Sequence, residues 1–133
     1  MSTVADAMRR EIKKVPHTTT VNEAASKMSA EKIGSLFVEK KGELVGIVTE
    51  TDVVRKAVAT GAVLGKITVE KIMTSPITTI EASRTVHDAS DMMGDLGIRH
   101  LGVTEYGKII GIISVRDLLV AQQRVSEPKI TQD

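Results

Sequence analysis

The chain contains one stretch of sequence twice, and this repeat limits the possible folds more than any other feature. The stretch GIVTETD, from Gly46 to Asp52, returns as GIISVRD, from Gly111 to Asp117. In each copy a short apolar run leads into a hydroxyl residue, and an aspartate follows three positions later where a helical pattern begins. Residues 8–54 align with residues 73–119 without a gap. We therefore expect a fold in which one supersecondary unit is used twice.

Three apolar runs in each copy predict β-strands. The first run lies beside a proline, and a glycine, Gly42 or Gly107, separates the second run from the third. Glycine permits the positive φ that a tight hairpin requires. The predicted strands are residues 12–15, 36–38 and 44–48 in the first copy and residues 77–80, 101–103 and 109–113 in the second.

Two helices are predicted in each copy. Apolar residues at helical spacing follow Thr20 and Thr85, and an acidic residue three positions after each threonine completes a capping box. The second helix begins at Thr49 or Ser114. The order in each copy is therefore βαββα, which predicts an α+β fold of tandem repeats that pack through their sheets with pseudo-two-fold symmetry.

A short amphipathic pattern precedes the first strand of each copy. It begins near residue 4 and again near residue 69, so the repeats are expected to span residues 4–66 and 69–121. Residues 122–133 lose apolar periodicity and contain a proline, which predicts a disordered tail. One copy of about 60 residues would bury too little surface to be comfortably stable, so the two copies are expected to share a core.

Composition excludes several classes of function. Net charge is +1 and like charges occur only in pairs, which argues against nucleic acid as the main partner. There is no apolar run of membrane-spanning length, and the absence of cysteine excludes disulfides, thiolate metal sites and cysteine nucleophiles. His17, His87 and His100 share no metal-ligand spacing, so no metal site is expected. A cytoplasmic protein is the expectation.

The paired hydroxyl and aspartate residues, Thr49 with Asp52 and Ser114 with Asp117, have two interpretations. This spacing is itself a capping box, which stabilises a helix without any ligand. A helix N-terminus also offers free amides to a phosphate, and an aspartate can accept hydrogen bonds from the two hydroxyls of a ribose. From spacing alone both interpretations remain open.

The second copy resembles a cystathionine-β-synthase (CBS) domain. The resemblance rests on MTSPITT at residues 73–79, the hairpin glycine Gly107 and GIISVRD at residues 111–117, and the first copy completes a CBS pair over residues 4 to about 121. It implies a Bateman module with up to two clefts for AMP, ADP, ATP or S-adenosylmethionine. In that family the Thr or Ser contacts phosphate or ribose, the Asp takes the ribose hydroxyls, and the first strand of the other repeat lines the base pocket.

The resemblance also implies which residues form each cleft. One cleft is expected from Thr49, Asp52, Ile77, Thr78, Thr79, Arg99, His100 and Arg116, and the other from Ser114, Asp117, Lys13, Lys14 and Val15. Guanidinium groups bind phosphate bidentately, so the cleft that receives Arg99 and Arg116 is expected to take the charged nucleotide. The alternative for these two arginines is a solvated surface pair.

The helices carry more apolar surface than one buried stripe needs. Met92 and Met93 are adjacent, as are Val53 and Val54. The excess predicts a homodimer formed through helices, and the resemblance implies a disc-shaped dimer. With no evident effector domain, the output is expected to pass to a separate effector protein.

The function expected from the sequence is therefore a stand-alone regulatory module that binds an adenine nucleotide and changes conformation. No cofactor is required for this function. The alternatives are an assembly module that binds no nucleotide, and a binder of S-adenosylmethionine. An enzyme is not expected, because no nucleophile with a base, metal cluster or carboxylate pair supports one.

Overall fold

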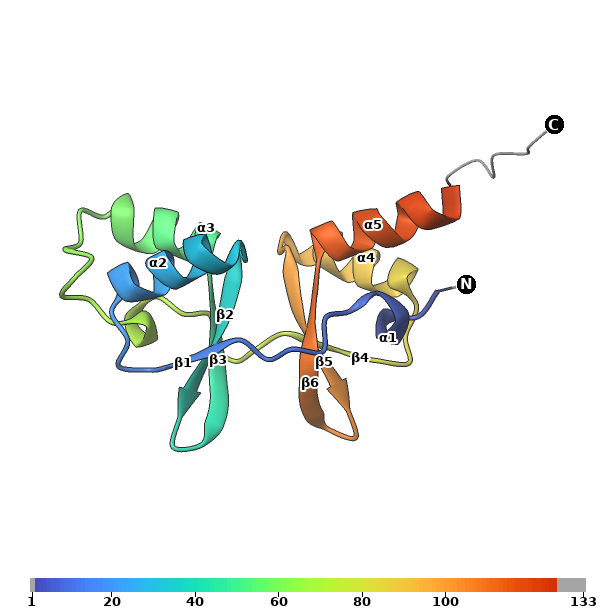
Figure 1. The fold of residues 1–133 in the computed structure, drawn as a ribbon, viewed down its shortest axis with the longest axis horizontal. Helices are drawn as coiled ribbons and strands as arrows, with labels where there is room; N and C mark the ends of the chain where they lie inside the picture. Colours follow the sequence, from blue (N-terminus) through green and yellow to red (C-terminus); the bar gives the residue numbers. More distant parts are fainter. Residues whose placement is uncertain (1, 127–133) are drawn as a thin grey trace. The chain divides into compact units, whose positions relative to one another are not determined.

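The computed structural model describes residues 2–126, which divide into two compact units (Figure 1). The β1–β3 unit consists of residues 12–77. The β4–β6 unit consists of residues 2–11 together with residues 78–126. Each unit combines a three-stranded sheet with helices, as the βαββα order predicts.

The two sheets have the same topology. In each, the first strand pairs parallel with the second, and the second pairs antiparallel with the third. The strands are β1 (Lys14–Pro16), β2 (Ser35–Lys40) and β3 (Glu43–Thr49) in one unit and β4 (Thr79–Glu81), β5 (His100–Glu105) and β6 (Lys108–Ser114) in the other. The hairpin turns confirm the glycine argument, since Gly42 has a φ of 79° and Gly107 a φ of 76°.

The first helix of each copy forms as predicted. These helices are α2 (Val21–Glu31) and α4 (Val86–Leu96). Thr20 Oγ1 accepts from the Glu23 amide at 3.2 Å, and Thr85 Oγ1 accepts from the Asp88 amide at 3.0 Å, so both capping boxes are present. The amide of Thr85 donates in return and, with its hydroxyl and Arg84, holds the pKa of Asp88 below its ordinary value.

The second helix begins after Thr49 or Ser114, as predicted, but it differs between the units. After Thr49 a single turn, α3 (Glu50–Asp52), continues as the π-helix η1 (Val53–Val58), whereas α5 (Val115–Ser126) is α-helical throughout. The prediction of disorder from Gln122 is wrong for residues 122–126, which extend α5. Gln and Arg are good helix formers, so a helix can continue after its apolar stripe ends. Residues 127–133 lie outside the described part of the chain.

Each compact unit contains a short helix that belongs to the other copy of the sequence repeat. The helix α1 (Val4–Ala7) packs in the β4–β6 unit, where Val4 is fully buried. The 3-10 helix η2 (Val69–Lys71) packs in the β1–β3 unit, where Val69 and Ile72 are 0% and 2% exposed. The sequence repeats, at 4–66 and 69–121, and the compact units thus have different boundaries.

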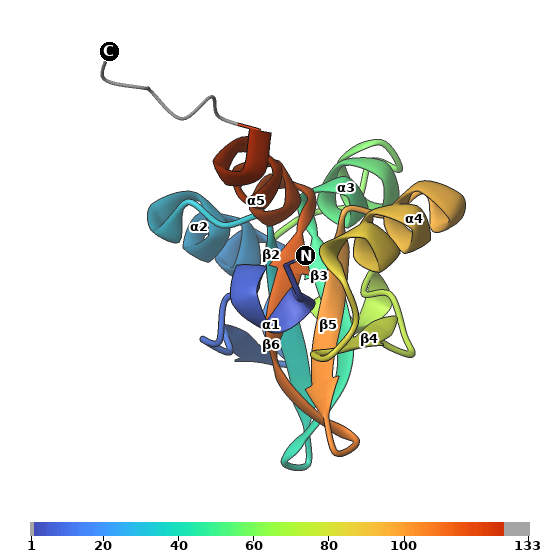
Figure 2. The ribbon, with the colours of Figure 1, turned by 90° about the vertical axis from the view of Figure 1, so that its right-hand side faces the viewer.

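Each unit has its own aliphatic core beneath its helices, and Figure 2 shows the β4–β6 unit with α1 next to α5. One core gathers residues from β1, α2, β2, β3, η1 and η2, and the other gathers residues from α1, β4, α4, β5 and β6. Among residues 2–126 no helix is both long enough and apolar enough to cross a bilayer.

Candidate ligand-binding site

The Thr49–Asp52 motif lies where β3 ends and α3 begins. Asp52 Oδ2 accepts hydrogen bonds from the Thr49 amide at 3.0 Å and from Thr49 Oγ1 at 3.2 Å. The Asp52 amide donates back to Thr49 Oγ1 at 3.2 Å. The capping box predicted from the spacing is therefore formed, and it holds the carboxylate at the N-terminus of the helix with only 8% of its side chain exposed.

Two further residues surround the Asp52 carboxylate. Lys56 Nζ lies 2.9 Å from Oδ1, one helical turn along the chain, and also donates to the Ile72 carbonyl at 3.3 Å. Thr74 Oγ1 lies 3.4 Å from Oδ1 and 3.5 Å from Oδ2, long contacts that contribute little. Both oxygens of Asp52 thus have partners, and a ligand hydroxyl that binds there has to share the carboxylate with Lys56.

The Ser114–Asp117 motif has the same cap and a more open surrounding. Asp117 Oδ2 accepts from the Ser114 amide at 2.8 Å and from Ser114 Oγ at 2.9 Å. Arg9 Nε lies 3.5 Å from the same oxygen, and 14% of the Asp117 side chain is exposed. All three contacts use Oδ2, so the cap and the arginine approach one oxygen of the carboxylate.

Asp117 also lines a cavity of about 340 Å³ in the β4–β6 unit. The other walls come from α1 and its flanks and from α5, with Ser2, Asp6 and Met8 on one side and Val120 on the other. The amide and hydroxyl of Thr3 donate to Asp6 and lower its pKa, which keeps a second anion at this cavity. The cavity therefore combines two carboxylates with a lining that is partly polar and partly apolar.

Five of the residues predicted from the resemblance gather at one end of the β5–β6 hairpin. His100 pairs with Ser114 across the two strands, and the Arg99 carbonyl accepts from the Val115 amide at 3.0 Å. Arg116 and Asp117 lie in the first turn of α5, and Arg99 and Arg116 are both exposed. The β4–β6 unit alone thus brings two cationic side chains near a hydroxyl–aspartate motif.

The other predicted residues lie on or beside the first strands. The Thr78 carbonyl accepts from the Gly102 amide at 2.9 Å, and Ile77 is the last residue of the β1–β3 unit. Val15 on β1 is 6% exposed, so its side chain belongs to the core.

The lysines near β1 pair with glutamates of their own unit. Lys13 Nζ lies 2.7 Å from Glu31 and, by hydrogen bonding, lowers the pKa of that carboxyl. Lys14 Nζ lies 2.7 Å from Glu39. A phosphate at either lysine would have to compete with its glutamate.

Sequence reasoning missed three residues that contact the motif aspartates. Lys56 could have been found, since it stands four residues after Asp52 on a predicted helix, the spacing of a helical ion pair. Arg9 and Thr74 had no such signal. They occupy equivalent positions in the two copies, but only the folded chain shows that each lies beside an aspartate of its own unit.

The described residues offer no metal-binding alternative. Within residues 2–126 no three His, Asp or Glu side chains gather so that they could hold an ion. The candidate site is therefore built from hydroxyl–aspartate caps and nearby guanidinium groups.

The comparison with protein families decides what these repeats are. The model described as "CBS domain" matches residues 4–59 and again residues 69–124. The chain belongs to the CBS-domain family. The resemblance stated from the sequence is thereby confirmed, and the two matches make this chain a CBS pair.

Two curated proteins illustrate the relationship. An uncharacterized protein of Methanopyrus kandleri is 37% identical over 118 residues, which cover 87% of this chain and 60% of that protein. The CBS domain-containing protein YhcV of Bacillus subtilis is 30% identical over 122 residues, covering 92% of this chain and 86% of YhcV. The chain thus spans less than two thirds of the first relative and most of the second.

Solved structures share the fold. An uncharacterized conserved protein from Pyrococcus horikoshii superposes with a TM-score of 0.87 at 31% identity, covering 92% of this chain and 93% of that one. A hexameric CBS-CP12 protein from bloom-forming cyanobacteria gives a TM-score of 0.85 at 30% identity, covering 97% of this chain and 76% of that one. The α+β architecture predicted from the repeat is confirmed by these matches.

Proposed function

We propose that this CBS pair is a regulatory module that binds an adenine nucleotide, AMP, ADP or ATP, through its hydroxyl–aspartate motifs. The observation that carries the proposal is the position of Asp117. Its carboxylate is fixed by Ser114 at a helix N-terminus and lines a cavity of about 340 Å³. A carboxylate held in this way can accept hydrogen bonds from both hydroxyls of a ribose.

The phosphates of the ligand would be bound by guanidinium groups. The resemblance assigns Arg99 and Arg116 to the cleft of Thr49 and Asp52, and both are exposed beside Ser114 in the β4–β6 unit. Each planar guanidinium group can bind two oxygens of a phosphate. We further propose that these arginines favour ATP over AMP. The ligand acts as a signal when it binds one conformation of the module better than another, and the partner protein responds to that shift in population.

Titration calorimetry of the full chain with AMP, ADP and ATP tests the proposal. Wild-type protein is compared with Asp117→Asn and Asp52→Asn, and Asp88→Asn serves as a matched control because Asp88 completes an ordinary capping box. Losing a hydrogen bond to a charged group costs roughly 1.5–3 kcal/mol, or about a 10- to 150-fold loss of affinity. We expect that loss in one or both motif variants and no loss in Asp88→Asn.

Two outcomes would contradict the proposal. The absence of heat and of thermal stabilisation with every nucleotide would leave the aspartates as helix caps, and it would favour the assembly module. An equal loss of nucleotide affinity in Asp88→Asn would show that the motif variants lose affinity because the protein is less stable. A parallel titration with S-adenosylmethionine separates the remaining alternative, since that ligand shares the ribose but lacks the phosphates.

The arginine contribution is tested by the ratio of ATP to AMP affinity. We expect Arg99→Ala to lower the affinity for ATP more than the affinity for AMP. Lys108→Ala, an exposed cation near the hairpin turn, is the control that should leave the ratio unchanged. If both nucleotides bind Arg99→Ala as they bind the wild type, Arg99 is a surface residue.

We also propose that the chain forms a homodimer. Several large apolar side chains are exposed on its helices, with Val54 and Leu119 at 57% and 60%. Exposed apolar side chains that gather on a surface mark interaction sites. Light scattering from micromolar upward should give twice the chain mass, and a constant single-chain mass would refute the dimer.

A further inference from the structure

Lys56 lies against the carboxylate of the first hydroxyl–aspartate motif. Its Nζ is 2.9 Å from Asp52 Oδ1 and donates to the Ile72 carbonyl oxygen at 3.3 Å. Ile72 is 2% exposed, and the nearby Thr74 exchanges two backbone hydrogen bonds with Ile47. The ammonium group is thus held between the motif aspartate and a fixed segment of the same unit.

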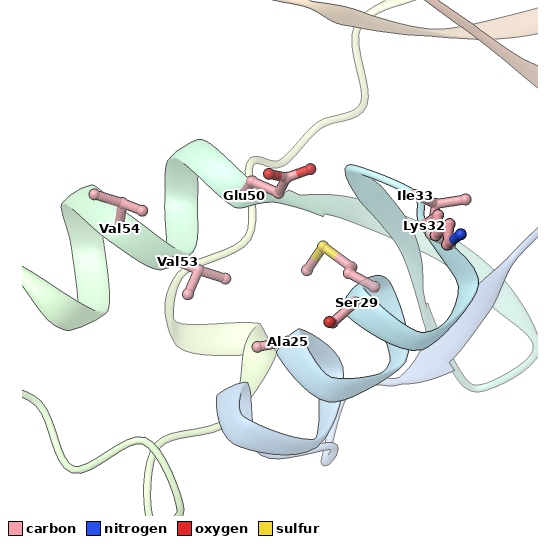
Figure 3. Close-up of a pocket in the computed structure, with 8 residues that line it drawn as sticks. Ala25, Ser29, Lys32, Ile33, Glu50, Val53 and Val54 are labelled. Carbon is pink, nitrogen blue, oxygen red and sulfur yellow. The ribbon is translucent and has the colours of Figure 1, made fainter.

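The helix that carries Lys56, formed by α3 and η1, has two different sides. Glu50 and Val53 line a groove of about 490 Å³ beside α2, and Figure 3 shows both side chains at that groove. Asp52 and Lys56 instead contact residues 72–74. From Val53 onward the helix is a π-helix, a rare form that occurs frequently at functional sites. The ion pair thus belongs to the side of an unusual helix that faces away from α2.

A ligand hydroxyl that binds Asp52 has to displace Lys56 at least in part. The cap uses Oδ2, which accepts from the amide and hydroxyl of Thr49, and Lys56 lies against Oδ1. A neutral nucleoside offers the displaced ammonium group no new anion. A nucleotide offers its phosphate, which Lys56 can follow because its stem is flexible and 48% of its side chain is exposed. The cost of displacing Lys56 therefore depends on whether the ligand carries a phosphate.

We propose that Lys56 is a specificity-determining residue, which makes the Asp52 motif favour phosphorylated nucleotides over neutral nucleosides. The inference rests on the proposed function and names the ligands that this motif excludes. The second motif lacks the same filter, since the residue equivalent to Lys56 is Ala121. The cap and Arg9 both approach Oδ2 of Asp117, so a nucleoside hydroxyl can bind Oδ1 there without displacing a cation.

Calorimetric titration with adenosine and AMP tests this role, because the two ligands differ only in the phosphate. The full-length chain with Asp117→Asn isolates the Asp52 motif. In that background we expect Lys56→Ala to lower the ratio of AMP affinity to adenosine affinity by about two- to fivefold, the range of an exposed ion pair. The adenosine affinity itself should rise by up to about twofold, since no helical ion pair has to be broken.

Three further variants serve as controls. Arg55→Ala removes an exposed cation at the preceding position of the same helix and should leave the ratio unchanged. Lys56→Arg retains a cation and should keep the ratio near that of the parent protein. Ala121→Lys, in an Asp52→Asn background, installs the lysine beside Asp117 and should raise the ratio at that motif by a similar factor.

Three outcomes would overturn the inference and leave the proposed function intact. An unchanged ratio in Lys56→Ala would show that the lysine forms only a helical ion pair, and an equal change in Arg55→Ala would show a general effect of charge. Loss of all AMP binding in Asp117→Asn, with binding retained by the wild type, would show that the Asp52 motif binds no ligand. Failure of the wild type to bind adenosine, AMP and ATP would instead refute the proposed function, so the two failures are distinguishable.

Discussion

The two hydroxyl–aspartate motifs have the same cap and different counter-ions. Asp52 contacts Lys56 at 2.9 Å, and the residue equivalent to Lys56 in the second copy is Ala121. Asp117 instead contacts Arg9, with Arg9 Nε 3.5 Å from Asp117 Oδ2. The residue equivalent to Arg9 in the other unit is Thr74. The repeat thus preserves what the helix needs, a carboxylate at its N-terminus, while the charge around each carboxylate has diverged. Two equivalent motifs are therefore two chemically different sites.

A second difference lies where the segment before the first strand of one copy contacts the hairpin of the other copy. Gly46 and Gly111 are equivalent, and each leaves room for a segment that comes from elsewhere in the sequence. A Cβ at residue 46 would lie 2.6 Å from Met73 Sδ, a flexible side-chain atom, and 3.0 Å from the Thr74 carbonyl oxygen. A Cβ at residue 111 would overlap the Arg9 carbonyl oxygen and Met8 Cε. The same glycine is thus more tightly constrained in the β4–β6 unit.

The largest expected effect concerns two fragments of equal length, 12–77 and 1–66. The first contains a complete compact unit, whereas the second lacks Val69 and Ile72 from the core of that unit. Fully burying one such side chain stabilises by about 1.5–3 kcal/mol, so losing two removes much of the stability of a small domain. We expect cooperative unfolding by circular dichroism for 12–77 and none for 1–66.

The opposite order of stability would mean that the sequence repeat, and not the compact unit, is the element that folds. A 12–77 fragment that carries Ile72→Ala serves as control, and it should lose about 2–5 kcal/mol.

The next effect separates the two glycines. Overpacking costs typically about 1–3 kcal/mol and occasionally more. We expect Gly111→Ala to lie at or above the upper end, since the Arg9 backbone cannot move away without breaking its hydrogen bonds to Ile112. Gly46→Ala should lie at the lower end of the same range because the Met73 side chain can rotate. Chemical denaturation measures the free energy of unfolding of each variant. An equal loss of stability in the two variants would show that the two glycines are equally constrained.

Removing or adding one lysine beside a motif aspartate should have the smallest effect on stability. Lys56 is about half exposed, so its pair with Asp52 stabilises by only about 0.3–0.5 kcal/mol. We expect Lys56→Ala to lose roughly that amount and Ala121→Lys, which installs the same spacing beside Asp117, to gain no more. Both changes should shrink in high salt. A salt-independent loss in Lys56→Ala would show that the lysine acts through its hydrogen bond to the Ile72 carbonyl.

Much of the fold and the first contacts of the site could be predicted because they are local. The capping boxes at Thr20, Thr49, Thr85 and Ser114 follow from spacing within one helical turn, and the hairpin turns follow from glycine at Gly42 and Gly107. At the start of a helix, the side chain three positions after the N-cap residue lies within hydrogen-bonding distance of the N-cap amide. The sequence repeat then assigns the same elements to both halves.

The segments that complete each unit, and the residues around each aspartate, could be known only from the folded chain. Val69 and Val4 are equally buried in two cores, and no local rule states which core receives which short helix. Thr74 and Asp52 are far apart in the sequence, and Arg9 and Asp117 lie near opposite ends of the chain, so these contacts arise from chain crossing and not from helical spacing. The two motifs and their caps follow from local sequence spacing. The packing of distant apolar side chains, which depends on burial and not on sequence separation, determined their neighbours.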